Sequence, residues 1–456
     1  MKKYLIVLLV FVAQGAAEAQ SNLTLYNMEP LPQMMIANPA KTPDCKWYIG
    51  MPALSSLEFQ FTSNALGLAD FNNAFIERPN DPGYNLSLTK LTGAIQKETF
   101  VGFGLNAEII NFGFRLRKSM FTFGITEKVK TRISVPSDVL KLAGQGNGGQ
   151  NLGYGFNFNF GFDVLHTREF ALGYIRKLLN DKLTVGGRVK YIRGLNVVQT
   201  EKNDAVFTTR PDDFNYDLTA DIEINASTPV FDSDGVAYDP IAVVAGSAKN
   251  SGFGIDVGGV FDLTKRIQLS ASIVDMGLIS WNDDTRNIVS KNPGATFRYR
   301  GVDFNDYIGD SSRGFEVLAD TLLDFFALDT TRNGFIMTLF SEFYLGGNFS
   351  LNDRHNAGIL LYGTFYNRQL NPAMTISWNS KLSRVFAISL NYSMTRGNFQ
   401  NLGLGLVSNF GPEQFYFVSD NAIGAVTGNV KNLGIRFGWN HVFGRKKYEK
   451  QRRADQ

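Results

Sequence analysis

The chain has little of what builds disulfide-stapled domains, metal sites or helical membrane spans. It contains one cysteine, Cys45, and three histidines, and it has no apolar run of about 18 residues after its N-terminal stretch. A single cysteine forms no internal disulfide, so stability must rest on packing and hydrogen bonds. Without a long apolar run, no transmembrane helix is expected. A chain of this kind crosses a membrane only as a closed barrel of strands, which satisfies every backbone group in lipid.

Charge and motifs exclude further classes of function. A formal net charge of +3 over 456 residues is too weak to indicate nucleic-acid binding. His166, His355 and His441 are predicted to lie at a turn, at a turn and on an outward strand face, so no metal cluster or Ser/His/Asp arrangement is supported. The Gly-rich pieces "GFGLN" and "GQGNGGQN" lack the setting of a nucleotide-binding loop. We predict no catalytic residue, metal or cofactor, with an outer-membrane hydrolase as the alternative left open.

The N-terminus has the organisation of a secretory signal. "MKKYLIVLLVFVAQGAAEAQ" begins with two lysines, continues with an apolar run and ends in small residues. This pattern predicts a signal peptide over residues 1–19, cleaved after Ala19, and the apolar run is too short to be a retained membrane helix. The mature protein is therefore expected to leave the cytoplasm.

Aromatic and glycine residues are abundant, with 38 Phe, 17 Tyr and 45 Gly, and they alternate along the chain. In "NLGIRFGWNHVF" every second residue from Leu433 to Phe443 is large and mostly apolar, and small or polar residues stand between them. In a membrane barrel the apolar face meets lipid and the polar face lines the lumen. We predict that Phe437, Trp439 and Phe443 face lipid and form part of an aromatic girdle.

The alternation recurs often enough to predict an all-β transmembrane antiparallel barrel of about 14 strands, within a range of about 12–16. Most runs reach the 9–11 residues that cross a bilayer, whereas strands of soluble sandwiches are usually about 5–6 residues long. The predicted strands are 47–63, 100–116, 119–134, 154–178, 182–196, 214–225, 252–263, 266–281, 335–351, 354–366, 370–381, 386–394, 402–407, 413–420 and 430–443.

Segments 64–99, 226–250 and 282–334 interrupt the pattern and are predicted to be loops. Within the last, residues 313–328 have helical spacing, which predicts a helix packed on the barrel rim, with a moving lid as the alternative. A shorter helix is expected after Pro136, with Ser137 as its cap. A slip in the alternation between Ile109 and Phe112 predicts a β-bulge.

Two further interpretations concern charged residues. Arg188, Lys190 and Arg436, together with Asp217, Asp221 and Glu223, fall on polar strand faces and are predicted to line the lumen, where they either pair and close it or line a solute path. The tail, residues 445–456, is predicted to be a solvated periplasmic segment, although its basic residues would also suit anionic lipid headgroups or an acidic partner.

Two pieces of sequence carry a family resemblance. "MMIANPAKTPDCKWYIGMP" contains Asn38, Pro39 and Ala40, and "LGLGLVSNFGPEQFYFVSDNAIG" precedes the final strand. The chain resembles the Bacteroidota outer-membrane family called domain of unknown function 5723. Through "NPA" and the 172–194 hairpin it is distantly similar to the long-chain fatty-acid channel superfamily, which includes barrels of type IX secretion.

The resemblance implies a barrel of about fourteen strands over residues 46–444 and an N-terminal plug over 20–45 that includes Asn38, Pro39 and Ala40. The composition of residues 27–44 agrees, since this stretch is too rich in proline for a strand and too apolar for a free tail.

Two functions remain for such a barrel in the cell outer membrane. One is a channel or transporter for a hydrophobic or small solute. The alternative is a non-conducting barrel that acts as a scaffold or anchor for a secretion or cell-envelope protein partner. Outer-membrane lipid is an expected partner in both cases. An apolar pocket beside the 24–45 segment would favour transport, and a blocked lumen with an apolar patch on the loops would favour the anchor.

Overall fold

A computed structural model describes residues 22–28, 31–65, 67–77, 84–86, 90, 98–228, 231–232, 235–236, 249–299, 328–366, 369–395, 398–427 and 431–445. The expected signal peptide, the expected helix at 313–328 apart from Leu328, and the tail beyond Arg445 lie outside the described residues.

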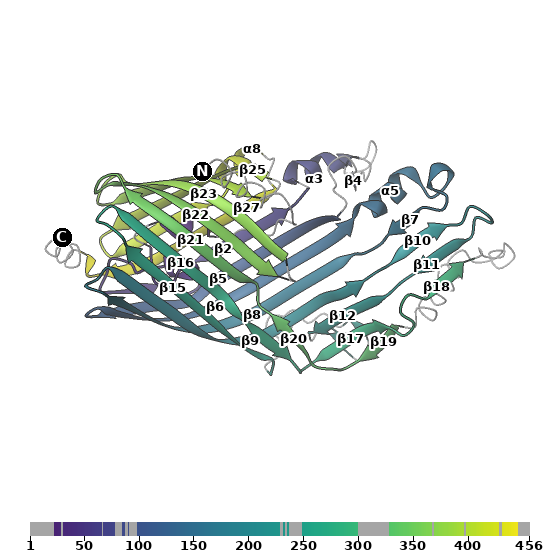
Figure 1. Cartoon of the computed structure of the whole chain (residues 1–456), viewed down its shortest axis with the longest axis horizontal. Helices are drawn as coiled ribbons and strands as arrows, with labels where there is room; N and C mark the ends of the chain where they lie inside the picture. The colour runs from purple at the N-terminus through teal and green to yellow at the C-terminus, as the bar shows by residue number, and fades with distance from the viewer. Residues whose placement is uncertain are drawn as a thin grey trace.

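The chain forms a closed antiparallel barrel of 14 strands, which confirms the predicted fold class and strand number (Figure 1). The ring closes where the last strand pairs with the first, through the pairs Trp47↔Phe443 and Phe59↔Ile435. In order around the ring the strands are β1 (Trp47–Gly50) with β2 (Leu57–Ser63), β5 (Glu98–Leu116), β6 (Ser119–Pro136), β8 (Gly161–Leu178), β9 (Leu183–Asn203), β15 (Ser251–Asp262), β16 (Ile267–Trp281), β21 (Ser341–Ser350) with β20 (Phe335–Thr338), β22 (His355–Tyr366), β23 (Gln369–Lys381), β24 (Phe386–Thr395), β25 (Asn398–Phe410), β26 (Glu413–Ser419) and β27 (Asn432–Phe443).

Alternation places the large apolar side chains on the outside. On β27, Phe437 is 37% exposed, whereas its neighbour Arg436 is 4% exposed and points inward. Trp439 stacks on Phe415 with ring centroids 5.3 Å apart, and Phe443 stacks on Trp47 at 3.9 Å. The structure thus places Phe437, Trp439 and Phe443 together on the outer face of the wall.

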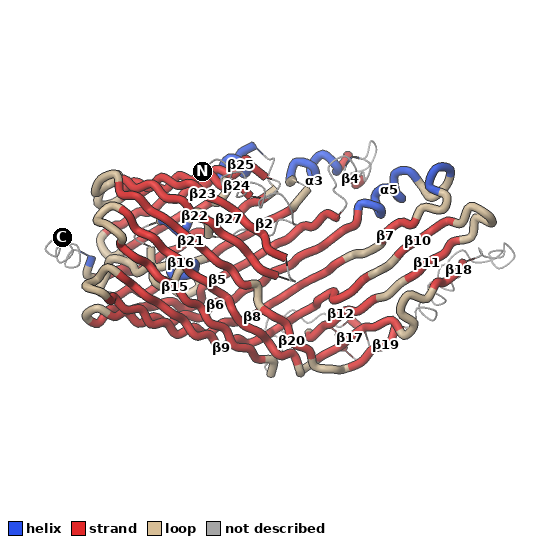
Figure 2. Tube along the Cα trace, in the orientation of Figure 1, coloured by secondary structure: helices blue, strands red, loops and turns tan. Residues whose placement is uncertain are grey.

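The two ends of the barrel differ (Figures 1 and 2). At one end, short turns join the strands, and the chain leaves β27 there. At the other end β5, β6, β8 and β9 extend past their neighbours. The extension adds β12 (Ile222–Ser227), β17 (Thr285–Ser290) and β19 (Leu328–Thr331) to the main sheet, and also a four-stranded sheet of β7 (Gly155–Asn157), β10 (Val206–Thr209), β11 (Tyr216–Thr219) and β18 (Thr296–Tyr299).

The remaining elements are short. They are α3 (Leu68–Ala74), β3 (Phe75–Glu77), β4 (Tyr84–Leu86), α5 (Ser137–Gln145), η3 (Gly149–Asn151), β13 (Phe231–Asp232), β14 (Gly235–Val236) and α8 (Ala422–Thr427). Within the described residues, no helix is long and apolar enough to cross a membrane.

The prediction of one barrel strand over 214–225 is wrong. The run breaks at Ala220, so that β11 joins the four-stranded sheet and β12 joins the extension beside β9. Asp217 therefore pairs with Arg298 on the surface, and Asp221 pairs with Lys202. Strict alternation indicates a strand in a sheet with one apolar face, but it does not indicate which sheet. Here the sheet is the four-stranded sheet of the extension, where Tyr216 packs on Phe207 with ring centroids 5.3 Å apart. Asp217, Asp221 and Glu223 thus belong to the extension and not to the barrel strands.

Other local expectations are revised as well. The expected 47–63 strand is interrupted between Gly50 and Leu57, although both halves pair with β5 and β27. The expected loops 64–99, 226–250 and 282–334 contain the short elements above, and His166 lies within β8, not at a turn. The bulge is confirmed by a register shift between Glu108 and Ile110.

The helix after Pro136 is present, but Ser137 is its first residue and Pro136 occupies the cap position without a side-chain bond. The next residue, Asp138, ties the helix to β7. Its carboxylate accepts hydrogen bonds from the backbone N of Asn157 at 2.9 Å, from Asn157 Nδ2 at 2.7 Å and from the Tyr154 hydroxyl at 3.0 Å. Burial alone would raise the pKa of Asp138, but these three bonds outweigh it and lower the pKa below its ordinary value.

We expect Asp138→Asn to weaken the attachment of α5 by about 1–3 kcal/mol, because an amide NH₂ would face donors. A depressed folded pKa gives stability that is present above the unfolded value, about 3.9, and is lost as the pH falls through the lower folded value. The stability of the α5 attachment is measured by amide hydrogen exchange of the helix, at pH 7 and at acidic pH, in the wild type and in the variant. Asp212→Asn is the control, since the Asp212 side chain is 76% exposed; equal exchange in both variants would contradict the prediction.

Candidate functional site inside the barrel

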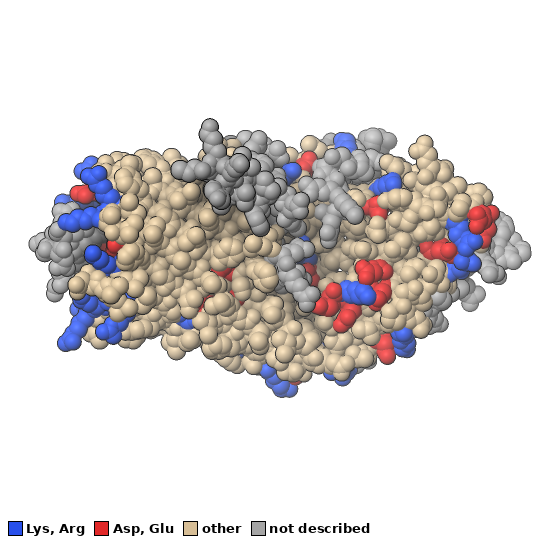
Figure 3. Space-filling view, viewed as in Figure 1, with Lys and Arg blue, Asp and Glu red and all other residues tan. Residues whose placement is uncertain are grey.

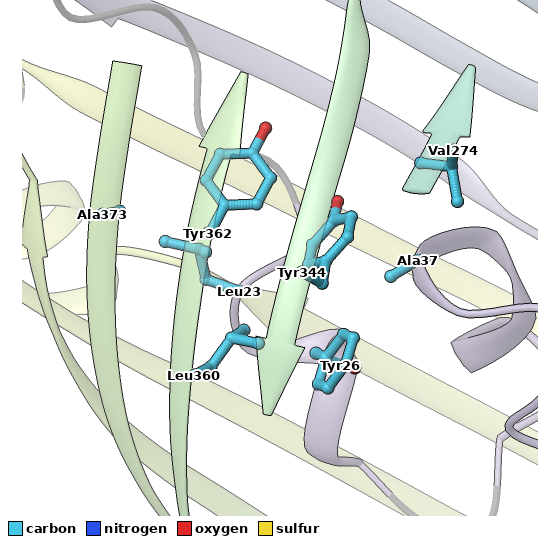
Figure 4. Packing of buried hydrophobic residues seen from close by; sticks show 8 residues of the cluster. All are labelled: Leu23, Tyr26, Ala37, Val274, Tyr344, Leu360, Tyr362 and Ala373. Carbon is cyan, nitrogen blue, oxygen red and sulfur yellow. The ribbon is translucent and has the colours of Figure 1, made fainter. Parts of the chain in front are cut away.

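The N-terminal segment, residues 22–28 and 31–45, lies inside the barrel. It contains η2 (Leu25–Asn27) and α2 (Met34–Ala37), and Leu25, Tyr26 and Leu31 are 0% exposed. Figure 4 shows Leu23, Tyr26 and Ala37 facing side chains of β21, β22 and neighbouring strands. The segment is therefore enclosed by the wall and does not lie on its surface.

Polar side chains hold the first half of the segment to strands on opposite sides of the ring. Thr24 accepts a hydrogen bond on its hydroxyl from Asn391 Nδ2 at 2.7 Å, and its backbone N donates to Asp420 Oδ1 at 2.8 Å. The Tyr26 hydroxyl donates to Ser270 Oγ on β16 at 2.9 Å. Residues far apart around the wall are thus joined through this short stretch.

Gln33 and Asn22 make polar contacts with the closing strand β27. Asn440 exchanges two hydrogen bonds with Gln33, each of 3.0 Å. Arg436 forms an ion pair with Glu58 at 2.6 Å and donates to Asn22 Oδ1 at 2.8 Å. The barrel seam, where β27 meets β1 and β2, is therefore bonded directly to the segment.

Asn38, Pro39 and Ala40 occupy a hollow in the wall. Asn38 Oδ1 accepts from the backbone N of Ala40 at 2.9 Å, and Asn38 Nδ2 donates to Tyr26 at 3.2 Å. Opposite them, Gly186 of β9 and Gly258 of β15 are paired across the two strands. A Cβ on Gly258 would lie 2.2 Å from Asn38 Oδ1, and one on Gly186 would lie 2.4 Å from the Pro39 carbonyl oxygen. Only glycine therefore fits at these two positions.

The wall carries apolar patches where the sequence predicted a polar lining. The first patch consists of Val274, Tyr344, Leu360, Tyr362 and Ala373, and it is covered by Leu23, Tyr26 and Ala37 of the segment. The second patch consists of Val407, Tyr416 and Val418, and it is covered by Leu25, Met28, Leu31 and Met34. These side chains are buried because the N-terminal segment covers them.

A cluster of charges lies on the lumen side of β6, β8, β9, β15 and β16 and adjoins the first patch at Val274. Arg188 pairs with Asp256 at 2.7 Å and donates to the Ile36 carbonyl at 3.0 Å, and Lys190 pairs with Asp256 at 2.9 Å. Lys128 binds Asp275 at 3.0 Å and Glu169 at 2.9 Å. Three bases thus meet three acids, so the cluster is neutral overall.

The structure brings Arg188, Lys190 and Arg436 to the lumen, as the sequence suggested, but with different acidic partners. These are Asp256, Asp275, Glu169 and, for Arg436, Glu58. Asp256 was not among the predicted lumen residues, although its place between the outward-facing Ile255 and Val257 is a signal that indicates it. Asp275 could not be recognised from the alternation, because it lies in a β-bulge of β16, where its own φ of +58° turns its side chain inward.

Two small voids, each of about 20 Å³, flank residues 23–28. The one toward the short turns is lined by Met28, Asn379, Ser389 and their neighbours. The one toward the long connections is lined by Leu23, Ser393, Asn401, Asn421 and others. A larger groove of about 390 Å³ lies on the outer face and is lined mainly by Phe59, Phe61, Phe103, Leu105, Leu433 and Ile435.

Fold and interior together define a fourteen-stranded barrel of the transmembrane type whose lumen is occupied by its own N-terminal segment. The chain belongs to a family described as a family of unknown function, DUF5723, whose profile matches residues 39–420. A search of curated proteins found no match.

Three solved structures are similar over most of their length. They are the toluene transporter TbuX of Ralstonia pickettii (11% identity, TM-score 0.43, covering 94% of this chain and 96% of that one), a Pseudomonas aeruginosa FadL homologue (11%, 0.40, 95% and 99%) and the monoaromatic hydrocarbon channel CymD (9%, 0.44, 94% and 98%). At these identities and scores nothing about a substrate follows.

Proposed function

We propose that the protein is an outer-membrane channel for a hydrophobic or small solute, closed in this state by residues 22–45. The observation that carries the proposal is the pair of apolar patches on the lumen wall, which the N-terminal segment covers. A pore for water and ions has a polar interior. If the segment left, Tyr344, Tyr362 and Val407 would be exposed in the lumen, which does not suit such a pore. A movable segment that covers apolar wall positions suits a channel for apolar solutes.

The way in which the segment is held also supports a movable closure. Hydrogen bonds to side chains and carbonyl groups hold the segment to the wall, and Cys45 is not in a disulfide. Such bonds exchange with water or solute at small net cost, about 0.5–1.5 kcal/mol each. Glycine positions such as Gly186 and Gly258 leave space for the segment that wall side chains would otherwise fill.

The outer face supports a membrane location. Large apolar side chains cover it, including Phe103 at 52% exposure and Leu345 at 56%, and aromatic pairs lie near the short turns. This is the surface that a bilayer covers in outer-membrane barrels. The predicted signal peptide is consistent with that compartment.

A reversible tether tests the proposal. In a Cys45→Ser background, Asn27→Cys and Ser377→Cys place two thiols where Asn27 Nδ2 and Ser377 Oγ are 3.1 Å apart. Joined by a short bifunctional thiosulfonate, which forms a disulfide with each thiol and releases sulfinate, the variant should show no solute uptake in liposomes, and reductive cleavage of the linker should restore it. The control pair is Lys118→Cys with Asp181→Cys, which joins two neighbouring exposed turns and should leave uptake unchanged.

The opposite result would favour the alternative function. If the tethered, cleaved and 24–42-deleted forms all insert and remain equally silent in uptake and planar-bilayer conductance, the lumen does not conduct. The protein would then be a scaffold or anchor for a secretion or cell-envelope complex, and its partners should be sought at the long connections.

A further inference from the structure

The short-turn end of the barrel carries a ring of basic side chains. Among the described residues at this rim, nine Lys and Arg are exposed, against two exposed acids, Asp262 and Asp353. Figure 3 shows the same asymmetry, with blue gathered at the end where the hairpins turn and blue mixed with red at the other end. The nine bases are Lys46, Arg117, Lys118, Arg176, Lys182, Lys265, Arg266, Arg354 and Arg384.

The bases are distributed around the ring. Five of the six hairpin turns at this end carry at least one of them, and the exception is the turn between β25 and β26, which is formed by Gly411 and Pro412. Lys46 lies beside the seam. A further acid at this rim, Asp181, has a side chain that is 41% exposed and forms an ion pair with Lys118 at 2.9 Å.

Aromatic side chains lie next to this ring on the outer face. Phe114 stacks on Phe121 at 5.3 Å, and Phe121 contacts Tyr174 at 5.2 Å. Phe386 contacts Phe410 at 5.9 Å in an edge arrangement. Rings of this kind mark the level at which a bilayer changes from hydrocarbon to headgroups. The basic ring lies further from the membrane centre than these aromatic side chains, and therefore at the level of the lipid headgroups.

We infer that this rim binds the phosphate groups of anionic phospholipids in the leaflet that the short turns face. Short turns of outer-membrane barrels face the periplasm. Long Lys and Arg side chains reach from the apolar belt to headgroup phosphates, and Arg matches phosphate with two parallel hydrogen bonds. The inference rests on the barrel spanning a membrane, as proposed above, and is independent of whether the lumen conducts.

The distribution favours lipid over an acidic protein. A protein partner contacts one side of a rim, and its binding surface would concentrate charge there. Lipids surround the whole circumference, and the basic side chains do the same. The rim thus acts as an electrostatic collar that fixes the depth of the barrel and recruits anionic lipid around it.

The test uses the full mature chain in detergent and lipid mixtures that contain equal phosphatidylglycerol and phosphatidylcholine. Lipids that remain bound are counted by native mass spectrometry. We expect phosphatidylglycerol to be enriched on the wild type, less so at high salt. In a variant with Lys46→Gln, Lys182→Gln and Arg384→Gln, each lost charge should weaken phosphatidylglycerol binding at its own position by about fivefold, so fewer phosphatidylglycerol molecules should remain bound.

The matched control carries Lys249→Gln, Lys291→Gln and Arg332→Gln, which are exposed bases of the long-connection side. It should keep the wild-type enrichment. Equal loss in both variants would mean a general charge effect and would overturn the proposal. So would a wild type without lipid preference that binds polyglutamate through the same three residues, since the rim would then be a protein-binding surface. Liposome uptake is measured in parallel, so that failure of the channel proposal is seen separately.

Discussion

Gly258→Leu is expected to open the lumen. A Cβ at this position would lie 2.2 Å from Asn38 Oδ1 and 3.0 Å from Pro39 Cδ, so the turn formed by Asn38, Pro39 and Ala40 must leave its hollow. Overpacking of this kind costs about 1–3 kcal/mol. If that cost falls on the closed state alone, the open population rises by about 5- to 150-fold. Liposome uptake of a small apolar solute should increase accordingly.

The neighbouring glycine gives a matched control. Gly259 faces outward, and a Cβ there meets only the Thr184 carbonyl oxygen, at 4.0 Å. Gly259→Leu adds the same side chain to the lipid side and should change neither uptake nor folding. Both variants must remain heat-modifiable in gel electrophoresis, which reports the folded barrel. Unchanged uptake in a folded Gly258→Leu barrel would show that the turn does not close a solute path.

The barrel could be predicted from the sequence because its signal is repeated along the whole chain. Each strand separates an apolar from a polar face, so errors at single strands, such as the break between Gly50 and Leu57, did not change the architecture. The extension was missed because its strands show the same alternation as the barrel strands. The 214–225 run has the alternation of a barrel strand, and nothing local indicates which sheet an amphipathic strand joins.

The interior was predicted less well. A lumen without a plug needs polar side chains, and the alternation on β27 supplied them in Arg436 and Asn440. A lumen with a plug also accepts apolar residues, as Val407 and Tyr416 show, because the segment covers them. The glycines opposite Asn38 and Pro39 were visible in the sequence, but their role depends on contacts between residues 220 positions apart for Gly258 and 147 for Gly186. Contacts at such separation leave no local pattern.

The second large effect concerns the charge cluster, where Lys190→Met should destabilise the barrel by about 3–5 kcal/mol. Lys190 is 3% exposed and contacts Asp256, Asp275 and Glu169. Its removal leaves three buried acids to share two bases, Lys128 and Arg188. The midpoint of urea unfolding in detergent measures the change. Lys202→Met breaks an exposed pair with Asp221 and should cost less than about 1 kcal/mol.

A compensating variant separates the charge from the packing. Asp256→Asn in the Lys190→Met background restores neutrality, since two acids then face two bases, and most of the lost stability should return. If the double variant is no more stable than Lys190→Met, the lysine acts by filling space. Because Arg188 joins this cluster to the Ile36 carbonyl of the N-terminal segment at 3.0 Å, uptake should be measured on the same variants. A stable double variant with raised uptake would show that the cluster also holds the segment closed, which ties the stability of the wall to the closure of the lumen.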